Sequence, residues 1–326
     1  MLNWAIIGSG DVVGRLVQDS LNVNNKSQVK YIYSKDFNKA QELERKFRFV
    51  KTIRDYKIIG NDKEINCIYI ATPPDSHFYY IKYFSKKIKN ILCEKPLGIN
   101  SKEIKNIKKI IKKNNNNFFI PFYRRFQKRF IYVNNIIKTK KLGQPIFFRY
   151  LLTHNLHNHP THPVNPKKNK KFIPWRFKKS IAGGGNYIDM GPHALDLINL
   201  LLGEISSIST NSSNLRKIYN VEETLCANIK LKNKICGQAI WSSVVGDKKD
   251  LFEIFFTKGK LEFSLNFNNL VITKQNSRIR KKKYTLSDPL HKNFILNMIK
   301  IIISKKNFVD FKGIDLSIKQ FESIKK

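Results

Sequence analysis

"WAIIGSGDVVGRLVQDSL", residues 4–21, begins as a short apolar strand, turns at Gly8 and Gly10, and continues as a predicted helix. Glycine at such a turn lets the backbone approach a pyrophosphate at the N-terminus of the following helix. Strand, turn and helix are the context that a G-x-G-x-x-G dinucleotide fingerprint requires. Val13 occupies the third-glycine position and Gly14 comes one residue late, so we expect the helix to pack slightly farther from the sheet.

Strand and helix patterns alternate through the rest of the first third. Apolar strands are predicted at residues 29–34, 65–74 and 90–96, and a helix is predicted at residues 38–47. Strands that alternate with helices form βαβ units around a parallel sheet. The N-terminal part is therefore predicted to be a dinucleotide-binding half.

The end of the second predicted strand bears on the choice of nicotinamide cofactor. NAD sites usually place an acid there for the ribose hydroxyls, whereas NADP sites accommodate the 2′-phosphate with small polar and basic groups. Ser34 and Lys35 come first in this chain, and Asp36 follows them. We therefore favour NADP(H) over NAD(H).

The composition is that of an ordered globular protein with an unusual charge. The chain has 326 residues, of which 41% are hydrophobic and 12% aromatic, so it can bury a large core. Sixty-one Lys plus Arg against 24 Asp plus Glu give a formal charge of +37, which raises nucleic acid or an anionic membrane as a partner. The lysines are spread along nearly every predicted helix and loop, so nucleic-acid binding is not expected as the main function.

The cysteines and the first residues indicate a reducing compartment. The four cysteines have no CxxC spacing and fall in apolar, strand-like stretches, so we expect buried free thiols at Cys67, Cys93, Cys226 and Cys236. The start MLNWAIIGSG lacks a basic leader, and no apolar run approaches membrane-spanning length. We expect a cytoplasmic protein without a signal peptide or a membrane partner.

A second informative stretch is AGGGNYIDMGPHALDLINLLLG, residues 182–203. Pro192 suits a first helical position, apolar residues recur after it at helical spacing, and Gly203 suits the stop. His193 then lies in the first turn of this helix, and the Asp189 carboxylate, just before it, either caps exposed amides or faces the imidazole. Taken alone, the segment fits a glycine loop before a capped core helix equally well.

Four motifs follow one another along the chain: GSGDVV, ATPPDSH, CEKP and GGGNYIDMGPHALD. With these motifs in this order and at these separations, nearly the whole chain resembles the Gfo/Idh/MocA family of glucose-fructose oxidoreductase and inositol dehydrogenase relatives. EKP at the end of a strand and the D-x-x-x-H pair after a glycine run are more specific than the G-x-G turn.

The resemblance implies an α/β fold. An N-terminal Rossmann domain with a doubly wound parallel sheet would span residues 1–121, and a substrate-binding and oligomerisation α/β domain with a large, mostly antiparallel open sheet would span residues 122–326. The second half contains six strand-like stretches, which are FFRYLLTH, ETLCANIKLK, ICGQAIWSS, LFEIFFT, KLEFSL and LVITK. Two closing helices, HKNFILNMIKIII and FKGIDLSIKQFESIKK, either stay with the second domain or pack back on the first.

The resemblance also implies site residues. The catalytic set would be Lys95, Asp189 and His193. Cofactor-binding residues would follow the ends of the first, second and later strands, namely Gly8, Ser9, Gly10, Asp11, Val12, Ser34, Lys35, Thr72, Pro73, Pro74, His77, Glu94 and Lys95. Substrate-pocket candidates come from FYRR and PWR, namely Tyr123, Arg124, Trp175 and Arg176.

These residue types suit alcohol oxidation by a nicotinamide. The hydroxyl must lose its proton as the carbon loses hydride, so a neutral base must touch that oxygen. A helix N-terminus would disfavour the imidazolium form of His193, and Asp189 would orient the ring or offset its charge. The Lys95 ammonium, at the carboxyl end of a parallel strand, would hydrogen-bond the reacting oxygen and stabilise a developing alkoxide. The roles reverse in the reducing direction.

Three other segments invite functional readings. THNLHNHPTHPVNP holds His154, His157, His159 and His162, which raises a zinc or nickel site, but the stretch lacks regular ligand spacing. We expect no metal there and instead a loop over the substrate pocket. KKNNNN (112–117) and RIRKKKY (278–284) are expected to be solvated surface.

We therefore expect an NADP- or NAD-dependent oxidoreductase that acts on a hydroxyl or carbonyl of a sugar, cyclitol or related diol. One alternative keeps the fold but is a glycosidase that uses tightly held NAD for transient oxidation. The other is a non-catalytic cofactor-binding or nucleic-acid-binding protein. By the resemblance, the chain forms a homodimer or homotetramer through its second domain.

Overall fold

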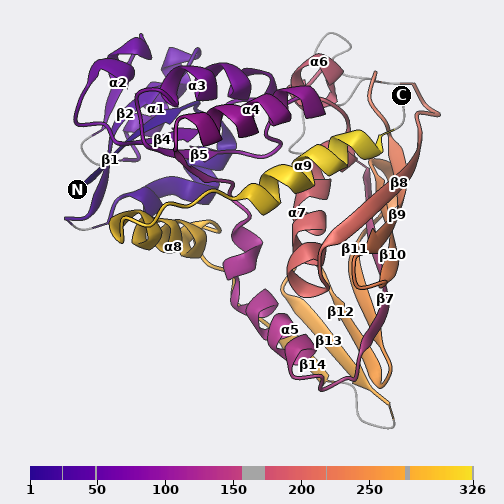
Figure 1. The fold of residues 1–326 in the computed structure, drawn as a ribbon. Helices are drawn as coiled ribbons and strands as arrows, with labels where there is room; N and C mark the ends of the chain where they lie inside the picture. Colours follow the sequence, from indigo (N-terminus) through magenta and orange to yellow (C-terminus); the bar gives the residue numbers. More distant parts are fainter. Residues whose placement is uncertain (24, 48–49, 156–172, 218, 276–279, 325–326) are drawn as a thin grey trace. The chain divides into compact units, whose positions relative to one another are not determined.

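The computed structural model describes residues 1–326 except 24, 48–49, 156–172, 218, 276–279 and 325–326. Its chain divides into two compact units (Figure 1). Unit 1 consists of Met1–Tyr123 and Ser287–Asp315, and unit 2 consists of Arg124–Leu286 and Leu316–Lys326. The chain thus leaves the first unit after Tyr123 and returns to it at Ser287.

Unit 1 is built on a six-stranded, all-parallel sheet of order β3-β2-β1-β4-β5-β6. Its strands are β1 (Leu2–Ile7), β2 (Ser27–Tyr33), β3 (Lys51–Ile53), β4 (Cys67–Ile70), β5 (Asn90–Cys93) and β6 (Asn117–Phe119). Strand β4 is buried throughout, as predicted for a parallel sheet covered on both faces. The strand order reverses between β1 and β4, where open α/β sheets bind ligands at the carboxyl edge.

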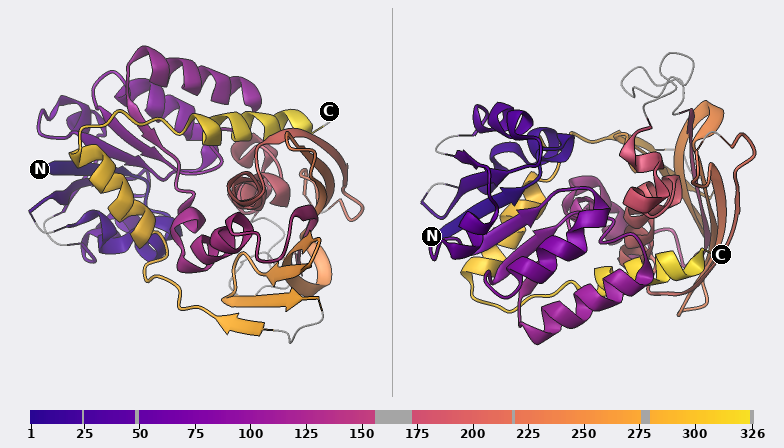
Figure 2. Two further views of the ribbon diagram at one scale, coloured as in Figure 1. Left: turned by 60° about the horizontal axis from the view of Figure 1, so that its bottom comes forward. Right: turned by 90° about the horizontal axis from the view of Figure 1, so that it is seen from above.

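Helices cover both faces of this sheet. They are η1 (Val12–Val17), η2 (Gln18–Leu21), α1 (Phe37–Glu44), α2 (Lys57–Asn61), η3 (Pro74–Ser76), α3 (His77–Phe84), α4 (Ser101–Lys113) and α8 (Lys292–Ile303). Figures 1 and 2 show α3 and α4 side by side on one face and α8 on the other. Helix α4 buries Ile104, Ile107 and Ile111 at helical spacing, and Asn100 caps it through the Glu103 amide.

Two details of unit 1 correct the sequence predictions. The segment after Gly10 is a wide π turn followed by a 3-10 turn rather than an α-helix, which fits the low helix propensity of its valines and of Gly14. The KKNNNN stretch is not all solvated, because Asn116 and Asn117 are buried. Asn116 Nδ2 donates to the Ser85 and Ile88 carbonyls at 2.9 Å, so this amide anchors the turn before β5.

Unit 2 is built on an eight-stranded sheet of order β14-β13-β12-β11-β7-β10-β9-β8. Its strands are β7 (Pro145–Asn155), β8 (Ile205–Ser213), β9 (Thr224–Leu231), β10 (Cys236–Ser242), β11 (Val244–Phe256), β12 (Gly259–Phe263), β13 (Asn269–Lys274) and β14 (Arg280–Lys283). All neighbouring pairs are antiparallel except β7 with β10. Together the two sheets confirm the predicted fold class.

Helices α5 (Lys128–Lys138) and α7 (Asn186–Leu201) and the later part of α9 (Phe311–Ser323) pack on one face of this sheet. Unit 2 also contains η4 (Tyr123–Phe126, from its second residue), η6 (Trp175–Phe177) and α6 (Lys179–Ala182). A large apolar core joins residues of α5 and α7 to alternate residues of the strands. Helix α7 is buried along almost its whole length.

The other face of the eight-stranded sheet is open, and it corrects the expectation for two cysteines. Cys67 and Cys93 are buried free thiols as predicted, whereas Cys226 and Cys236 are free but exposed. Strand alternation explains the difference at Cys226, because its neighbours Leu225 and Ala227 face the core. Strands β8 and β14 were not predicted: one is rich in serine and the other is four basic, exposed edge residues.

Candidate active site

In unit 1, the turn after β1 carries the first of the predicted cofactor residues. Gly8 has φ of +110°, and a Cβ there would lie 2.6 Å from the Ala71 carbonyl oxygen, so only glycine lets the end of β1 approach the end of β4. A Cβ at Gly10 would meet no described atom within 4 Å, which leaves the turn open above the sheet edge. Asp11 is exposed and Val12 begins η1.

The glycine that packs against a neighbouring element is displaced by one residue, as the sequence indicated. Val13 is fully buried, and a Cβ at Gly14 would lie 3.0 Å from Cδ2 of Leu43 on α1. Gly14 therefore provides a close approach between η1 and α1. The structure gives close packing here at Gly14 rather than at Val13.

The end of β2 joins the first turn through hydroxyl groups. Ser9 Oγ donates to Ser34 Oγ at 2.8 Å, and the Asp36 amide donates to the same Ser34 oxygen at 3.2 Å. The Asp36 carboxylate is the N-cap of α1 and accepts the Lys39 amide at 3.1 Å, a bond that lowers the pKa of Asp36. The acid that could bind ribose hydroxyls is thus turned toward its own helix.

Lys35 lies near the loop that follows β4. Its ammonium acts on the carboxyl of Asp75, where burial raises the pKa and Lys35 opposes the rise. In the same loop, Thr72 Oγ1 accepts the Ser76 hydroxyl at 2.7 Å, Pro73 precedes η3, and Pro74 is buried within it. Predicted cofactor residues from β1, β2 and β4 therefore share one edge of the sheet.

His77 is placed differently from its predicted contact with the cofactor. It is fully buried, with Nε2 2.8 Å from the Thr72 carbonyl oxygen and Nδ1 2.9 Å from that of Pro96. This burial argues against direct contact and gives the ring a structural part, since it joins the loops after β4 and β5. Burial lowers the pKa of His77 to about 4, although both carbonyls favour the protonated ring.

We expect His77 to make folding stability depend on pH. The pKa of this histidine is 6.5 in the unfolded chain and about 4 in the fold. Between pH 6.5 and pH 4 the unfolded chain therefore binds a proton that the native chain does not. The free energy of unfolding should therefore fall by up to about 3 kcal/mol as the pH drops from 7 to 4. Urea unfolding of the parent and His77→Gln at several pH values measures this, and the parent should lose more. Parallel curves would contradict it.

The end of β5 carries Glu94 and Lys95. Glu94 is buried, with Oε1 accepting the Tyr69 hydroxyl at 2.8 Å and Oε2 facing the Lys95 amide at 3.3 Å. Tyr69 is itself fully buried. Its desolvation, and to a smaller extent the nearby Glu94 carboxylate, raises the pKa of its phenol. The carboxylate thus fixes the backbone at the start of the Lys95 loop, while the Lys95 side chain is half-buried at the carboxyl edge of the sheet.

Two of the predicted substrate residues contact other residues of their own unit. The Tyr123 ring lies 4.3 Å from the His291 ring, both in unit 1. Arg124 is buried in unit 2, where Nε donates to the Leu265 carbonyl at 3.2 Å and Nη2 to Asn266 Oδ1 at 2.7 Å. This use of the guanidinium argues against the predicted substrate contact of Arg124.

In unit 2, helix α7 carries the predicted catalytic residues Asp189 and His193, and it begins earlier than predicted. The helix spans Asn186–Leu201, so Pro192 is inside it and Asp189, rather than His193, is in the first turn. The dipole argument for a neutral His193 therefore fails, because the effect fades beyond the first turn. Asp189 and His193 are one turn apart, so they lie on the same side of the helix. Gly203 has φ of +118° just after the helix, as predicted for its stop.

Asp189 has an arginine partner that the sequence did not pair with it. Arg176 Nε lies 3.4 Å from Asp189 Oδ2, and the Arg176 guanidinium lies 4.3 Å above the Trp175 ring. Trp175 and Arg176 are on η6, which shares unit 2 with α7. The structure thus brings together two predicted substrate residues and one predicted catalytic residue.

Further along α7, Asp196 is buried, and both of its carboxylate oxygens accept hydrogen bonds from one arginine. Arg125 Nε lies 2.9 and 3.0 Å from the two carboxylate oxygens, and Nη2 also donates to Oδ1. Arg125, the neighbour of the predicted Arg124, therefore fixes the middle of α7. Sequence reasoning had no signal to choose between these two arginines.

Glu222, before β9, is a residue that sequence reasoning missed. Its Oε2 accepts the Gly185 amide at 2.8 Å, and a Cβ at Gly185 would overlap the Glu222 carbonyl oxygen. The glycines before α7 are therefore needed so that this carboxyl can reach the helix. The adjacent acids Glu222 and Glu223, in a chain poor in acids, were the available signal.

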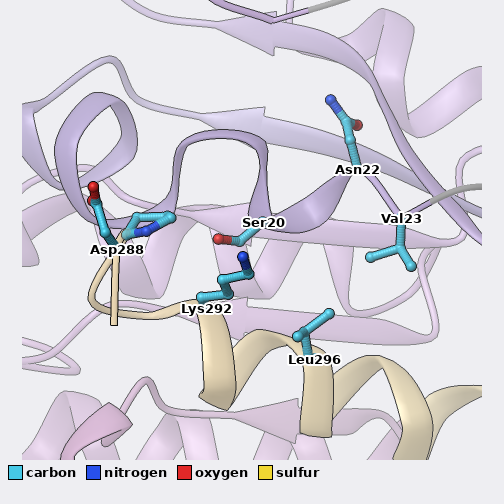
Figure 3. Close-up of a pocket in the computed structure, with 7 residues that line it drawn as sticks. Ser20, Asn22, Val23, Asp288, Lys292 and Leu296 are labelled. Atoms are coloured by element: carbon cyan, nitrogen blue, oxygen red, sulfur yellow. The ribbon is translucent and has the colours of Figure 1, made fainter. Parts of the chain in front are cut away.

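A cavity in unit 1 is separate from these residues (Figure 3). Its volume is about 350 Å³, and its lining is Ser20, Asn22, Val23, Asp288, Pro289, Lys292 and Leu296. None of the predicted cofactor residues lines it. The segment containing Ser20 leads into the amino end of β2, whereas cofactor residues follow the carboxyl ends.

Two further features concern only the part of the chain that the structure describes. No group of three His, Cys, Asp or Glu side chains there could hold a metal ion, and His157, His159 and His162 lie outside it. Within the same residues, no helix has the length and apolar character needed to cross a membrane.

Comparison with protein families decides the relationship. A family described as oxidoreductases with an NAD-binding Rossmann fold matches residues 2–122, and the Gfo/Idh/MocA C-terminal domain matches residues 130–262. The chain belongs to the Gfo/Idh/MocA family. This confirms the family predicted from the four motifs and makes the protein a member of an oxidoreductase family.

Individual members of the Gfo/Idh/MocA family are distant in sequence but alike in fold. Oxidoreductase P35 of Formosa agariphila is 23% identical over 290 residues, which are 89% of this chain and 87% of that protein. A structure of levoglucosan dehydrogenase in complex with NADH and levoglucosan matches 99% of this chain and 96% of that chain, with a TM-score of 0.84 and 21% identity. A variant 3-ketoreductase from Actinomadura kijaniata, solved with TDP-benzene and NADP, matches 98% and 94% with a TM-score of 0.79 and 16% identity.

Proposed function

We propose that the protein is a dehydrogenase or reductase that transfers hydride between NADP(H) and a hydroxyl or carbonyl carbon of a sugar, cyclitol or related diol. The observation that carries the proposal is the pair Asp189 and His193, one turn apart on α7, with Arg176 on the carboxylate. Family membership supplies the redox chemistry, and relatives named as levoglucosan and dihydrodiol dehydrogenases support the substrate class.

The carboxyl edge of the unit 1 sheet fits a dinucleotide. The backbone at Gly8 and Gly10 would approach the pyrophosphate, because Gly8 admits no side chain and the space beside Gly10 is open. Ser9 and Ser34 hydroxyls would face the ribose, and Thr72 and Pro73 would flank the nicotinamide ribose. A nicotinamide bound there supplies the hydride acceptor or donor.

The proton is handled by side chains of this chain. During oxidation the substrate C–H bond breaks as hydride leaves, and the O–H bond breaks as His193 takes the proton. The Lys95 ammonium donates a hydrogen bond to the same oxygen and stabilises the charge that develops on it. Asp189 offsets the charge of the protonated imidazole and is itself oriented by Arg176.

The preference for NADP(H) rests on how the residues after β2 are used. The Asp36 carboxylate caps α1, so it is engaged away from a ribose. Ser34 and Lys35 then provide the hydroxyl and ammonium that a 2′-phosphate requires. Solved relatives with NADH and with NADP both exist, so the choice depends on these local residues.

A titration tests the cofactor assignment. We expect NADPH to bind the purified protein at least about tenfold more tightly than NADH, because one ammonium–phosphate bond contributes about 1.5 kcal/mol. Lys35→Ala should abolish the preference, and the exposed Lys63→Ala should keep it. Nicotinamide fluorescence measures both affinities, and tighter NADH binding by the parent would contradict the assignment.

A substrate screen then tests the reaction class. Sugars, anhydrosugars, cyclitols and vicinal diols are mixed with enzyme and oxidised cofactor, and absorbance of the reduced nicotinamide is followed. Net reduction of the nicotinamide cofactor by any of these compounds supports the proposal. Cleavage of a glycoside with no net change in nicotinamide would favour the glycosidase alternative instead.

A homo-oligomer is part of the same proposal. The open face of the eight-stranded sheet exposes Phe147, whose ring stacks on that of Phe255 with centroids 4.3 Å apart. Exposed apolar side chains clustered on a sheet face are typical of a protein–protein interface. We propose that two copies pair through this face.

A further inference from the structure

Glu222 is a buried carboxyl to which the proposed reaction assigns no role. It lies between β8 and β9, its Oε1 is shielded from solvent, and its Oε2 accepts the Gly185 amide at 2.8 Å. Gly185 is the N-cap of α7 and has no side chain to cap it. A residue remote in sequence therefore provides the cap that local sequence does not.

The glycine run before α7 is shaped around this carboxyl. A Cβ at Gly185 would overlap the Glu222 backbone and lie 3.2 Å from Oε1, and one at Gly184 would lie 3.4 Å from Oε2. Any larger residue at Gly185 would push the carboxyl away from the helix. The close approach of Glu222 thus depends on the sequence motif that also carries Asp189 and His193.

The charge of Glu222 is balanced at the start of the helix. Burial raises the pKa of Glu222, while the Gly185 and Tyr187 amides, its own amide and the Lys179 ammonium favour the carboxylate. A carboxylate at a helix N-terminus is stabilised by the exposed amides there. The hydrogen bond from the Gly185 amide to Glu222 therefore holds the start of the turn that contains Asp189.

Other contacts among the described residues also hold the beginning of helix α7, including the ion pair of Arg176 with Asp189. The Tyr187 carbonyl accepts Gln320 Nε2 at 2.6 Å, and the Tyr187 hydroxyl meets Ser323 Oγ at 3.0 Å. The ion pair of Asp196 with Arg125 fixes the helix after His193. Glu222 holds the backbone before Asp189. Asp189 and His193 therefore lie between two fixed points of the helix, one at Gly185 and one at Asp196.

We propose that Glu222 is a positioning residue that holds the first turn of α7 and thereby sets Asp189 and His193 for proton transfer. It acts through the Gly185 amide and does not touch the substrate. This inference rests on the proposed function, because it assigns a role in that reaction. A displacement of about 1 Å in such a pair can cost about 100-fold in rate.

The chain offers a matched control in the next residue. Glu223 is also buried, but its Oε2 accepts the Arg216 amide at 2.9 Å and is not bonded to α7. Glu222→Ala removes the cap, and Glu222→Gln keeps an acceptor oxygen for Gly185. Glu223→Ala removes a buried carboxyl of the same kind from the same segment.

We expect Glu222→Ala to lower kcat by about tenfold or more, with an unchanged KM for the cofactor. Glu222→Gln should restore kcat to within about threefold of the parent, and Glu223→Ala should keep kcat even where it lowers Tm. Hydrogen exchange of the peptide 186–193 should accelerate in Glu222→Ala alone.

Equal kcat in Glu222→Ala and the parent would overturn the inference, as would equal exchange of peptide 186–193 in the two proteins. An equal loss of kcat in Glu222→Ala and Glu223→Ala would also overturn it, since it would indicate general destabilisation. If the parent turns over none of the test compounds, the proposed function fails separately, and the exchange data still decide whether Glu222 holds the turn.

Discussion

Replacing Lys95 by alanine is expected to lower kcat by roughly 100- to 1,000-fold, the usual cost of removing one donor that stabilises a developing oxyanion. Lys95 is the second residue after β5, at the carboxyl edge of the parallel sheet, and the buried Glu94, bonded to Tyr69, fixes the backbone there. The NADPH affinity should stay within about threefold, because the lost bond acts on the reacting oxygen. Steady-state kinetics and a fluorescence titration give the two values.

Lys89, at the amino end of the same strand, provides the control for Lys95. It is exposed, its ammonium donates to the Asn115 carbonyl, and no proposed role involves it. Lys89→Ala should keep the parent kcat. Loss of cofactor binding without a change in kcat for Lys95→Ala would place Lys95 at the cofactor rather than at the reacting oxygen.

Replacing His193 by alanine is expected to lower kcat by roughly 100- to 10,000-fold, as for removal of a general base. His193 is buried on α7, one turn beyond Asp189, so the two side chains lie on the same face of the helix. Added free imidazole should restore part of the activity in His193→Ala, because it can occupy the vacated volume and take the proton. Rates at several imidazole concentrations measure this rescue.

The Asp189 pair gives a graded comparison with His193. Asp189→Asn keeps the shape but removes the charge that meets Arg176, so its loss of kcat should be smaller than that of His193→Ala. A kcat of His193→Ala within twofold of the parent, or no response to imidazole together with normal activity, would remove His193 from the proton-transfer step.

Local patterns were sufficient where the physics is local. Gly8 was predicted as a turn residue that lets the backbone approach a pyrophosphate, and its φ of +110° is one that glycine adopts readily. Apolar runs bounded by turn residues identified strands β1, β4 and β5, whose side chains are buried on both faces. These features depend on residues that are neighbours along the chain.

Helix α7 shows where local patterns misled. Pro192 was taken as the first helical residue, because proline suits that position and breaks a helix interior. The helix nevertheless starts at Asn186 and passes through Pro192. Anchors from elsewhere in the chain, at Gly185 from Glu222 and at Asp196 from Arg125, stabilise it across the missing amide.

The sequence by itself determined the family, the two kinds of sheet, the glycine turn at Gly8, and the order of the candidate residues along the chain. Only the tertiary structure decided how those residues are used: Asp36 as a helix cap, His77 as a buried link between loops, Arg124 inside unit 2, and Glu222 on the start of α7. The physical reason is sequence separation. The Gly185–Glu222 and Arg125–Asp196 bonds join residues 37 and 71 positions apart, and no local periodicity encodes such pairs.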